Sequence, residues 1–190
     1  EDVMKQSTKI SQDADNLAKA LKGQNKTAGN WGENVLETIL QNSGLIKNEH
    51  YFTQQNFKVE NEEGKTKKSI PDFLVKLPNS DGNGDTIVID SKVSLVAYEK
   101  YFNAESEEER SLALKDHIDS IRKHVYELKD KDYEKVVQGN IDFVMMFVPI
   151  ESAYMLAMQN DPSLWQEAYQ KKVVLISATN MISCLRLVAD

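Results

Sequence analysis

Several residue types are scarce in this chain of 190 residues, and each scarcity excludes a class of protein. Cys184 is the only cysteine, so an intrachain disulfide is impossible, and the composition fits a reducing compartment. No apolar run approaches the roughly 18 residues of a membrane-spanning helix, and no signal-peptide pattern is present. Basic residues do not predominate: 23 lysines and arginines against 30 aspartates and glutamates give a net charge of -7. This charge disfavours a protein coated in nucleic acid but permits a local basic patch.

The residues that are present describe an ordinary folded domain. Hydrophobic residues make up 41% and charged residues 28% of the chain, the balance of a soluble globular protein with a sizeable core. The chain starts at Glu1, and its last residues, LRLVAD, stop inside a helical pattern. We therefore expect a fragment of a longer protein, truncated at its C-terminus.

Apolar residues recur at a spacing of seven near the start of the chain, at Val3, Ile10 and Leu17. This spacing is typical of a coiled-coil seam, but one amphipathic helix that packs on its own domain fits it equally well. Glycine and asparagine follow and predict a linker. We expect an N-terminal helix and linker over residues 1–28 and a single domain over residues 29–190.

The rest of the chain predicts an α/β layered fold with a central mixed sheet flanked by helices. Turn formers separate three strand-like segments, which we interpret as an antiparallel meander. The continuous apolar run IDFVMMFVP predicts a strand buried on both faces, and two helices and a strand after it predict a parallel crossover. The expected elements are a helix over 31–43, strands over 50–60, 70–77 and 85–93, a long helix over 105–137, a strand over 141–149, helices over 151–159 and 164–170, a strand over 172–177 and a final helix from 181.

One candidate site follows the third of these strands. The triplet Asp90-Ser91-Lys92 matches (Asp/Glu)-x-Lys, a spacing expected about once by chance in a chain of this length. Two further matches lie in a polar turn and on a helix, but Asp90 and Lys92 end a strand, where residues two apart share a face. If Leu77 and Thr86 flank the preceding loop, antiparallel pairing brings Asp72 opposite Ser91.

Two converging carboxylates repel each other unless a cation or a proton neutralises one of them. A hard divalent cation such as Mg²⁺ or Mn²⁺ would bind Asp72 and Asp90, and Lys92 would stabilise a developing oxyanion or help activate water. Glu33, at the rim of the apolar face of the first domain helix, is a further candidate. The alternative is that the aspartates are exposed strand-end residues and Lys92 a surface ion-pair partner, and spacing alone favours this interpretation. For Glu33 the alternative is a first-turn acid favoured by the helix dipole.

Collinear segments of the chain resemble the RmuC family of DNA recombination proteins, which is placed in the PD-(D/E)xK nuclease-like superfamily. The resemblance extends from about residue 29 to the end and implies a restriction-endonuclease-like fold. By this resemblance, Pro71-Asp72 and Asp90-Ser91-Lys92 are the motif, Asp72 and Asp90 hold Mg²⁺, and Lys92 lies next to the scissile phosphate. Glu33 and the carbonyl oxygen of Ser91 would complete the ligands. The segments are GNWGENVLETIL, SGL, YFTQQ, IPDFLVKLP, IVIDSKVSLVAYEKY, HIDSIRKHVYEL, FVMMFVPIESAY and VVLISATNM.

The resemblance implies a bacterial Mg²⁺-dependent DNA endonuclease that limits recombination between inverted repeats. The alternative is a DNA-binding or scaffold module that kept the fold without catalysis. The expected partner is DNA, with self-association through the N-terminal helix and no small-molecule cofactor. RmuC-like proteins commonly carry a long coiled coil before this domain, often behind a membrane-anchoring segment. We expect a cytoplasmic location, and anchoring of a longer parent on the cytoplasmic side of a membrane stays open.

A second group of polar side chains provides weaker candidates for DNA contacts. Two glutamines lie in the first meander strand, three lysines lie in the turn before Asp72, and one glutamate begins the helix after the buried strand. A solvated position is the alternative for the glutamines, where it is the more frequent one, and for the lysines. For the glutamate the alternative is a helix-start acid favoured by the helix dipole. These residues are Gln54, Gln55, Lys65, Lys67, Lys68 and Glu151.

Other residues that often carry chemistry have structural interpretations here. His117 and His124 are seven apart, a spacing unsuited to a helical zinc pair, so we expect boundary histidines. Trp165 and Tyr169 are expected in the core more than on a base-stacking surface. Cys184 lies among apolar residues and is expected to pack in the core.

Overall fold

The computed structural model describes residues 25–54, 57–60, 66–76, 86–92, 95–131, 133 and 143–189. The predicted N-terminal helix within residues 1–24 lies outside these residues, so its coiled-coil spacing stays a prediction. In the described part of the chain, no helix is both long and apolar enough to cross a bilayer.

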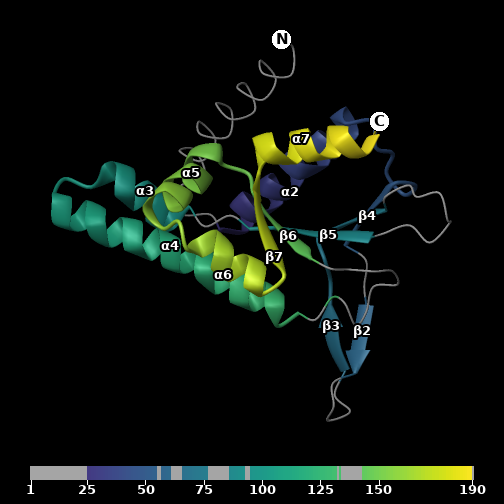
Figure 1. Cartoon of the computed structure of the whole chain (residues 1–190), viewed down its shortest axis with the longest axis horizontal. Helices are drawn as coiled ribbons and strands as arrows, with labels where there is room; N and C mark the ends of the chain where they lie inside the picture. The colour runs from purple at the N-terminus through teal and green to yellow at the C-terminus, as the bar shows by residue number, and fades with distance from the viewer. Residues whose placement is uncertain are drawn as a thin grey trace.

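A five-stranded mixed sheet forms the centre of the fold, in the strand order β1-β4-β5-β6-β7. β1, β4 and β5 pair antiparallel, and β6 and β7 continue the sheet in parallel. β2 and β3 form a separate two-stranded sheet, and Figure 1 shows this hairpin extending away from the main sheet. The strands are β1 (Tyr51–Thr53), β2 (Phe57–Glu60), β3 (Thr66–Ser69), β4 (Phe73–Lys76), β5 (Thr86–Ser91), β6 (Val144–Val148) and β7 (Val173–Ser177).

Helices cover both faces of the sheet (Figure 1). Side chains that alternate along the strands enter two separate cores, because successive residues of a strand point to opposite faces. Val88 packs in the core beneath α4, α5 and α6, whereas Ile89 packs in the core beneath α2 and α7. The helices described are α2 (Asn25–Asn42), α3 (Val96–Asn103), α4 (Glu107–Lys129), α5 (Glu151–Asn160), α6 (Leu164–Gln170) and α7 (Ala178–Ala189).

The α/β class, the mixed sheet and the parallel crossover are confirmed. The antiparallel meander is confirmed for β1, β4 and β5, but the predicted strand over 50–60 is wrong. β1 and β2 are separate strands in different sheets, and β3 lies in the predicted lysine-bearing turn, where it pairs with β2. The predicted central strand is also confirmed, because β6 lies between β5 and β7 and sends side chains into both cores. The predicted register of the second hairpin is wrong by one residue. Lys76, not Leu77, pairs with Thr86, and Phe73 pairs with Ile89. Continuing this register places Asp72 opposite Asp90.

Several predicted helix limits need correction, and one helix was not predicted. α2 already includes Asn25, the first described residue, and so covers part of the predicted linker. Ala28 is buried in a third small core with Tyr98, so tertiary packing outweighs the weak helix propensity of asparagine and glycine. α7 begins at Ala178 and not at residue 181. α3 was not predicted from the sequence. Its N-cap Leu95 and its residue Tyr98 are buried in the third core, so the side of α3 that carries them faces the protein interior. α4 ends at Lys129 and not at residue 137, since the last apolar residue of its buried stripe is Leu128.

Three side chains expected in the core are exposed instead. Trp165 and Tyr169 are 52% and 56% exposed on α6, where Leu164 and Ala168 supply the buried face. Cys184 is exposed on α7, because Met181 and Leu185 occupy the face toward the sheet. A short amphipathic helix buries only one stripe, and the apolar pattern did not identify which stripe it would be.

Candidate active site

Asp72 and Asp90 meet where β4 begins and β5 ends. The peptide N–H of Ser91 donates a 2.8 Å hydrogen bond to Asp72 Oδ2, which ties the turn before β4 to the end of β5. Val88 faces the core beneath α4, so Asp90, two residues later, points to that same face. The two carboxyls are close enough for the charge of Asp90 to raise the pKa of Asp72.

The Asp90 carboxylate is completely buried and lies between two ammonium groups. Lys92 Nζ lies 3.0 Å from Oδ2, and Lys131 Nζ lies 2.6 Å from Oδ1. The Tyr133 hydroxyl donates to Oδ1 over 3.2 Å. Oδ2 accepts no hydrogen bond of good geometry from the described residues, so its contact with Lys92 is an ion pair defined by distance. A buried carboxylate needs such partners, because an unpaired charge in the interior is strongly unfavourable.

Lys131 and Tyr133 are the site residues that sequence reasoning missed. The predicted helix over 105–137 would have placed both on a helical surface, but α4 ends at Lys129 and Asp130 caps it. The chain then turns back, and the Lys131 N–H donates to the Leu128 carbonyl oxygen over 3.2 Å. The available signal was the stop of the apolar repeat at Leu128, followed by the charged stretch KDKDY.

Burial and neighbouring carboxylates raise the pKa of Asp72 to about 7 from its ordinary value of 3.8. Desolvation is the largest cause, followed by the negative charge of Asp90, and Glu33 adds a smaller increase. The Ser91 N–H and the Lys92 charge oppose the shift. Near neutral pH, Asp72 is therefore present in both its protonated and its ionised form, and a cation beside it would favour the ionised form.

Glu33 lies near this pair but does not complete a cage. Gln54 Nε2 donates to Glu33 Oε2 over a long 3.5 Å, and the Gln54 N–H donates to the Asp72 carbonyl oxygen over 3.0 Å. Gln54 is exposed, with a positive φ of 48°. Among the described residues, no group of three or more histidine, cysteine, aspartate or glutamate side chains is gathered closely enough to hold a metal ion. The structure thus brings together Asp72, Asp90 and Lys92, with Glu33 at the edge.

Ser91 and Glu151 make contacts other than those expected. Ser91 contacts Asp72 through its backbone N–H, and its buried hydroxyl has no hydrogen-bond partner in the part of the chain that the structure describes. Glu151 begins α5 and accepts a 3.2 Å hydrogen bond from the Thr179 N–H at the start of α7. β5, β6 and β7 are parallel, so Glu151 lies at the same sheet edge as Lys92, but this contact joins α5 to α7.

Four predicted DNA-contact residues cannot be placed by their side chains. Gln55 and Lys65 lie outside the described residues. Lys67 and Lys68 belong to β3, where their backbones pair with Val59 and Lys58 of β2, and only this backbone is described. Their side-chain roles stay predictions.

The two histidines have local structural partners. His117 is buried and its Nε2 lies 2.8 Å from the Ala153 carbonyl oxygen, which makes Nε2 the donor. Burial lowers the pKa of His117 despite this hydrogen bond. His124 lies 3.0 Å from Glu127 on the same helix. His124 agrees with the predicted boundary histidine, whereas for His117 the prediction is wrong, because it is fully buried against α5.

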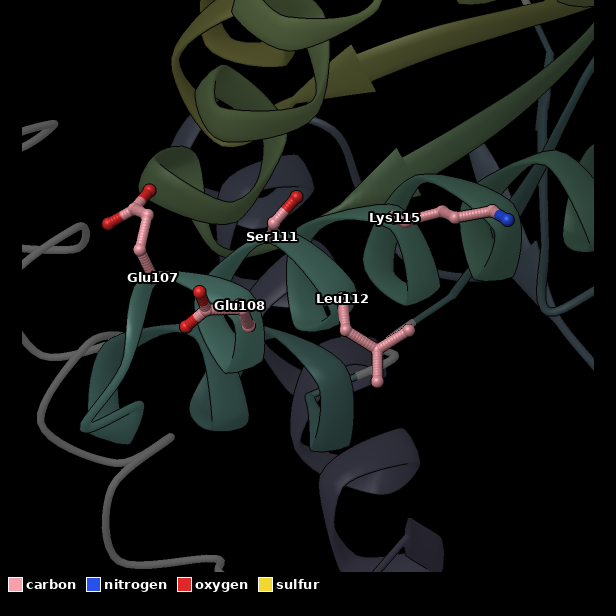
Figure 2. A pocket seen from close by; sticks show the side chains of 5 residues that line it. All are labelled: Glu107, Glu108, Ser111, Leu112 and Lys115. Carbon is pink, nitrogen blue, oxygen red and sulfur yellow. The ribbon is translucent and has the colours of Figure 1, made fainter.

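A surface hollow of about 490 Å³ lies on α4, away from these carboxyls. Figure 2 shows that all of its labelled side chains come from this one helix, with two carboxylates at one end. Lys115, the nearest of these residues to Lys131, is 16 positions before it, which corresponds to roughly 24 Å along a helix. The hollow is therefore separate from the candidate site. Its residues are Glu107, Glu108, Ser111, Leu112 and Lys115.

Comparison with known proteins identifies the family. The RmuC family model matches residues 1–190. A DNA recombination protein RmuC homolog of Yersinia pestis is 42% identical over 182 residues, covering 95% of this chain and 36% of that protein. The homolog of Pasteurella multocida is 44% identical over 182 residues, which cover 95% of this chain and 34% of that protein. DNA recombination protein RmuC of Escherichia coli K12 is 43% identical over 182 residues, which cover 95% of this chain and 37% of that protein. The chain spans about a third of the length of these relatives, and no solved structure matches it. The chain belongs to the RmuC family.

Proposed function

We propose that this domain is a metal-dependent DNA nuclease of the PD-(D/E)xK superfamily that hydrolyses phosphodiester bonds. The observation that carries the proposal is the juxtaposition of Asp72, Asp90 and Lys92 at the ends of two paired strands. The order of helix, antiparallel meander, helix and parallel strand agrees with a restriction-endonuclease-like fold. The relatives' name, DNA recombination protein, supports DNA as the substrate. A role at inverted repeats and a cytoplasmic location are further parts of this proposal.

The carboxyls fit Mg²⁺ or Mn²⁺ as a site of two protein ligands. Asp90 Oδ2 is buried and accepts no hydrogen bond from the described residues, and desolvation together with the charge of Asp90 raises the pKa of Asp72. Mg²⁺ commonly binds one or two carboxylates and takes its other ligands from water and substrate phosphates. Asp72 and Asp90 would hold the ion, with Glu33 acting through water and the Ser91 carbonyl oxygen as a further ligand. Bound there, the ion would neutralise phosphate charge and make water more acidic.

Lys92 has the position required to bind a phosphate. Its ammonium is held 3.0 Å from the fully buried Asp90, while its own side chain remains 27% exposed. Its N–H donates to the Phe147 carbonyl oxygen over 3.0 Å, so the backbone is fixed by the sheet. A cation held this way stabilises charge on a transferring phosphoryl group without reorganising. Basic side chains of the β2–β3 hairpin and Gln54 would add contacts to the DNA backbone.

The test is cleavage of single-stranded, duplex and branched DNA by the chain with Mg²⁺ or Mn²⁺. We expect Asp90→Asn and Lys92→Met each to lower the rate by about 100-fold or more. The matched controls are Asp116→Asn and Lys129→Met, which alter exposed residues of α4 and should leave the rate unchanged. Circular dichroism would establish that every variant is folded. Cleavage that is equal in wild type, Asp90→Asn and Lys92→Met would refute the assignment of the site.

A DNA-binding or scaffold module without catalysis is the second candidate. It is favoured by the two ammonium groups that already neutralise Asp90 and by the lack of a three-ligand cluster among the described residues. It predicts salt-dependent DNA binding and self-association through residues 1–22, with no cleaved product. Gel-shift and cleavage assays on the same DNA would separate the two candidates.

A further inference from the structure

Asp90 has one more ammonium partner than a site with a single motif lysine requires. Lys92 belongs to the triplet and pairs with Oδ2, while Lys131 arrives from the turn after α4 and pairs with Oδ1 over 2.6 Å. One carboxylate and two ammonium groups carry a net positive charge. A divalent cation that approached Asp90 would meet both ammonium groups at close range, where like charges repel strongly.

We propose that the Lys131 ammonium occupies the place on Asp90 Oδ1 that a divalent cation would take, and that the cation binds only when it displaces Lys131. Lys131 is then an internal competitor that sets the affinity of the site for metal. This inference rests on the proposed function, because it concerns the same site, but it makes its own prediction about cation binding without DNA.

Lys131 is the ammonium suited to leave. Lys92 follows β5 directly, and its N–H is bonded to β6, so its side chain starts from a fixed strand end. Lys131 starts from a turn, its side chain is 28% exposed, and its Nζ lies 5.5 Å from the centre of the Tyr133 ring. The face of that ring is an alternative place for an ammonium, since aromatic faces attract cations. Displacement therefore needs only rotation of the lysine side chain.

Tyr133 would keep Asp90 in place during the exchange. Its ring is buried, and its hydroxyl lies 3.2 Å from Asp90 Oδ1 and 3.3 Å from the Ile70 carbonyl oxygen. When Lys131 departs, the hydroxyl still donates to Oδ1, so the carboxylate keeps one hydrogen bond and its orientation. Tyr133 is in this view a positioning residue, and Lys131 is the group that moves.

Mn²⁺ binding to the whole chain, measured by calorimetry or electron paramagnetic resonance, tests the competition. If the Lys131 ammonium pairs with Asp90 in about nine of ten molecules, only about one in ten can bind the cation. Lys131→Met should then bind Mn²⁺ about tenfold more tightly than wild type. Lys131→Arg, which keeps a positive charge beside Asp90, and the neighbouring control Lys129→Met should bind like wild type. The gain in Lys131→Met should persist at about 0.5 M salt, because direct displacement is screened far less than a distant charge effect.

A measurement on the wild type keeps the test independent of how well the variants fold. In spectra of the ¹⁵N-labelled lysine ammonium groups, Mg²⁺ should shift or remove the Lys131 signal, assigned with Lys131→Arg, and leave that of Lys129 unchanged. Equal Mn²⁺ affinity in wild type and Lys131→Met, a gain seen only at low salt, or an unmoved Lys131 signal would overturn the inference. No binding by any variant would also overturn it. Tighter binding by Lys131→Met without DNA cleavage would refute the nuclease function and leave the inference standing.

Discussion

Raising the pH from 5 to 8 should destabilise this domain through one residue, Asp72. Its pKa is raised to about 7 in the folded chain, whereas the ordinary value of 3.8 applies when the chain is unfolded. Between these two values the folded chain holds a proton that the unfolded chain has released. The free energy of unfolding therefore falls as the pH rises through this window, and it becomes constant above about pH 7 with respect to this group.

The size of the effect follows from the two pKa values. The free energy of unfolding should fall by about 2 to 3 kcal/mol between pH 5 and pH 8. It falls by about 1.4 kcal/mol for each pH unit over which the folded chain binds one proton more than the unfolded chain. Asp72→Asn removes the titration and keeps an oxygen that can accept from the Ser91 N–H. We therefore expect Asp72→Asn to be more stable than wild type, and the difference to grow by this amount over the same range.

Urea denaturation at pH 5, 6, 7 and 8, in buffers with a chelator, measures the difference. Asp116→Asn, an exposed aspartate on α4, is the control for the loss of one negative charge and should follow wild type at every pH. A difference between wild type and Asp72→Asn that is the same at pH 5 and pH 8 would refute the reasoning. It would mean that the carboxyl is not desolvated beside Asp90 as the structure has it.

The remaining predictions concern contacts that hold the layers together, and urea denaturation measures each. Leu36→Ala should lower the free energy of unfolding by about 3 kcal/mol, because Leu36 is 0% exposed on the buried side of α2. Leu112→Ala should lower it by less than about 0.5 kcal/mol, because Leu112 is 62% exposed. Equal losses would contradict the assignment of the core. Arg122→Met should cost about 1 kcal/mol, since Arg122 joins α4 to Asp161 at 2.6 Å and Glu167 at 2.9 Å in a partly buried network. Arg110→Met, which breaks an exposed pair, is its control, and an equal effect would show that the network adds nothing. Tyr133→Phe should cost about 1 to 2 kcal/mol, because the hydroxyl donates to a buried carboxylate, and an unchanged midpoint would show that this hydrogen bond is absent.

Periodicity along the chain was sufficient for most of the fold. Alternation and apolar runs predicted β4, β5, β6 and β7 and their order, because a strand buried on both faces needs a continuous apolar segment. The spacing of Asp90 and Lys92 on one strand also predicted that they share a face, and their ion pair at 3.0 Å agrees with it. These features depend on residues within a few positions of one another, where backbone geometry alone sets the directions of the side chains.

Packing between distant segments decided the rest. The one-residue shift that places Asp72 opposite Asp90 depends on the whole β4–β5 ladder, and the extension of α2 into the predicted linker depends on the burial of Ala28. The partners of Asp90 could not be predicted locally, since Lys131 and Tyr133 are 41 and 43 positions away and reach it only because α4 ends early. Complete burial of the Asp90 charge requires neutralising groups, and only the folded chain determines which residues provide them.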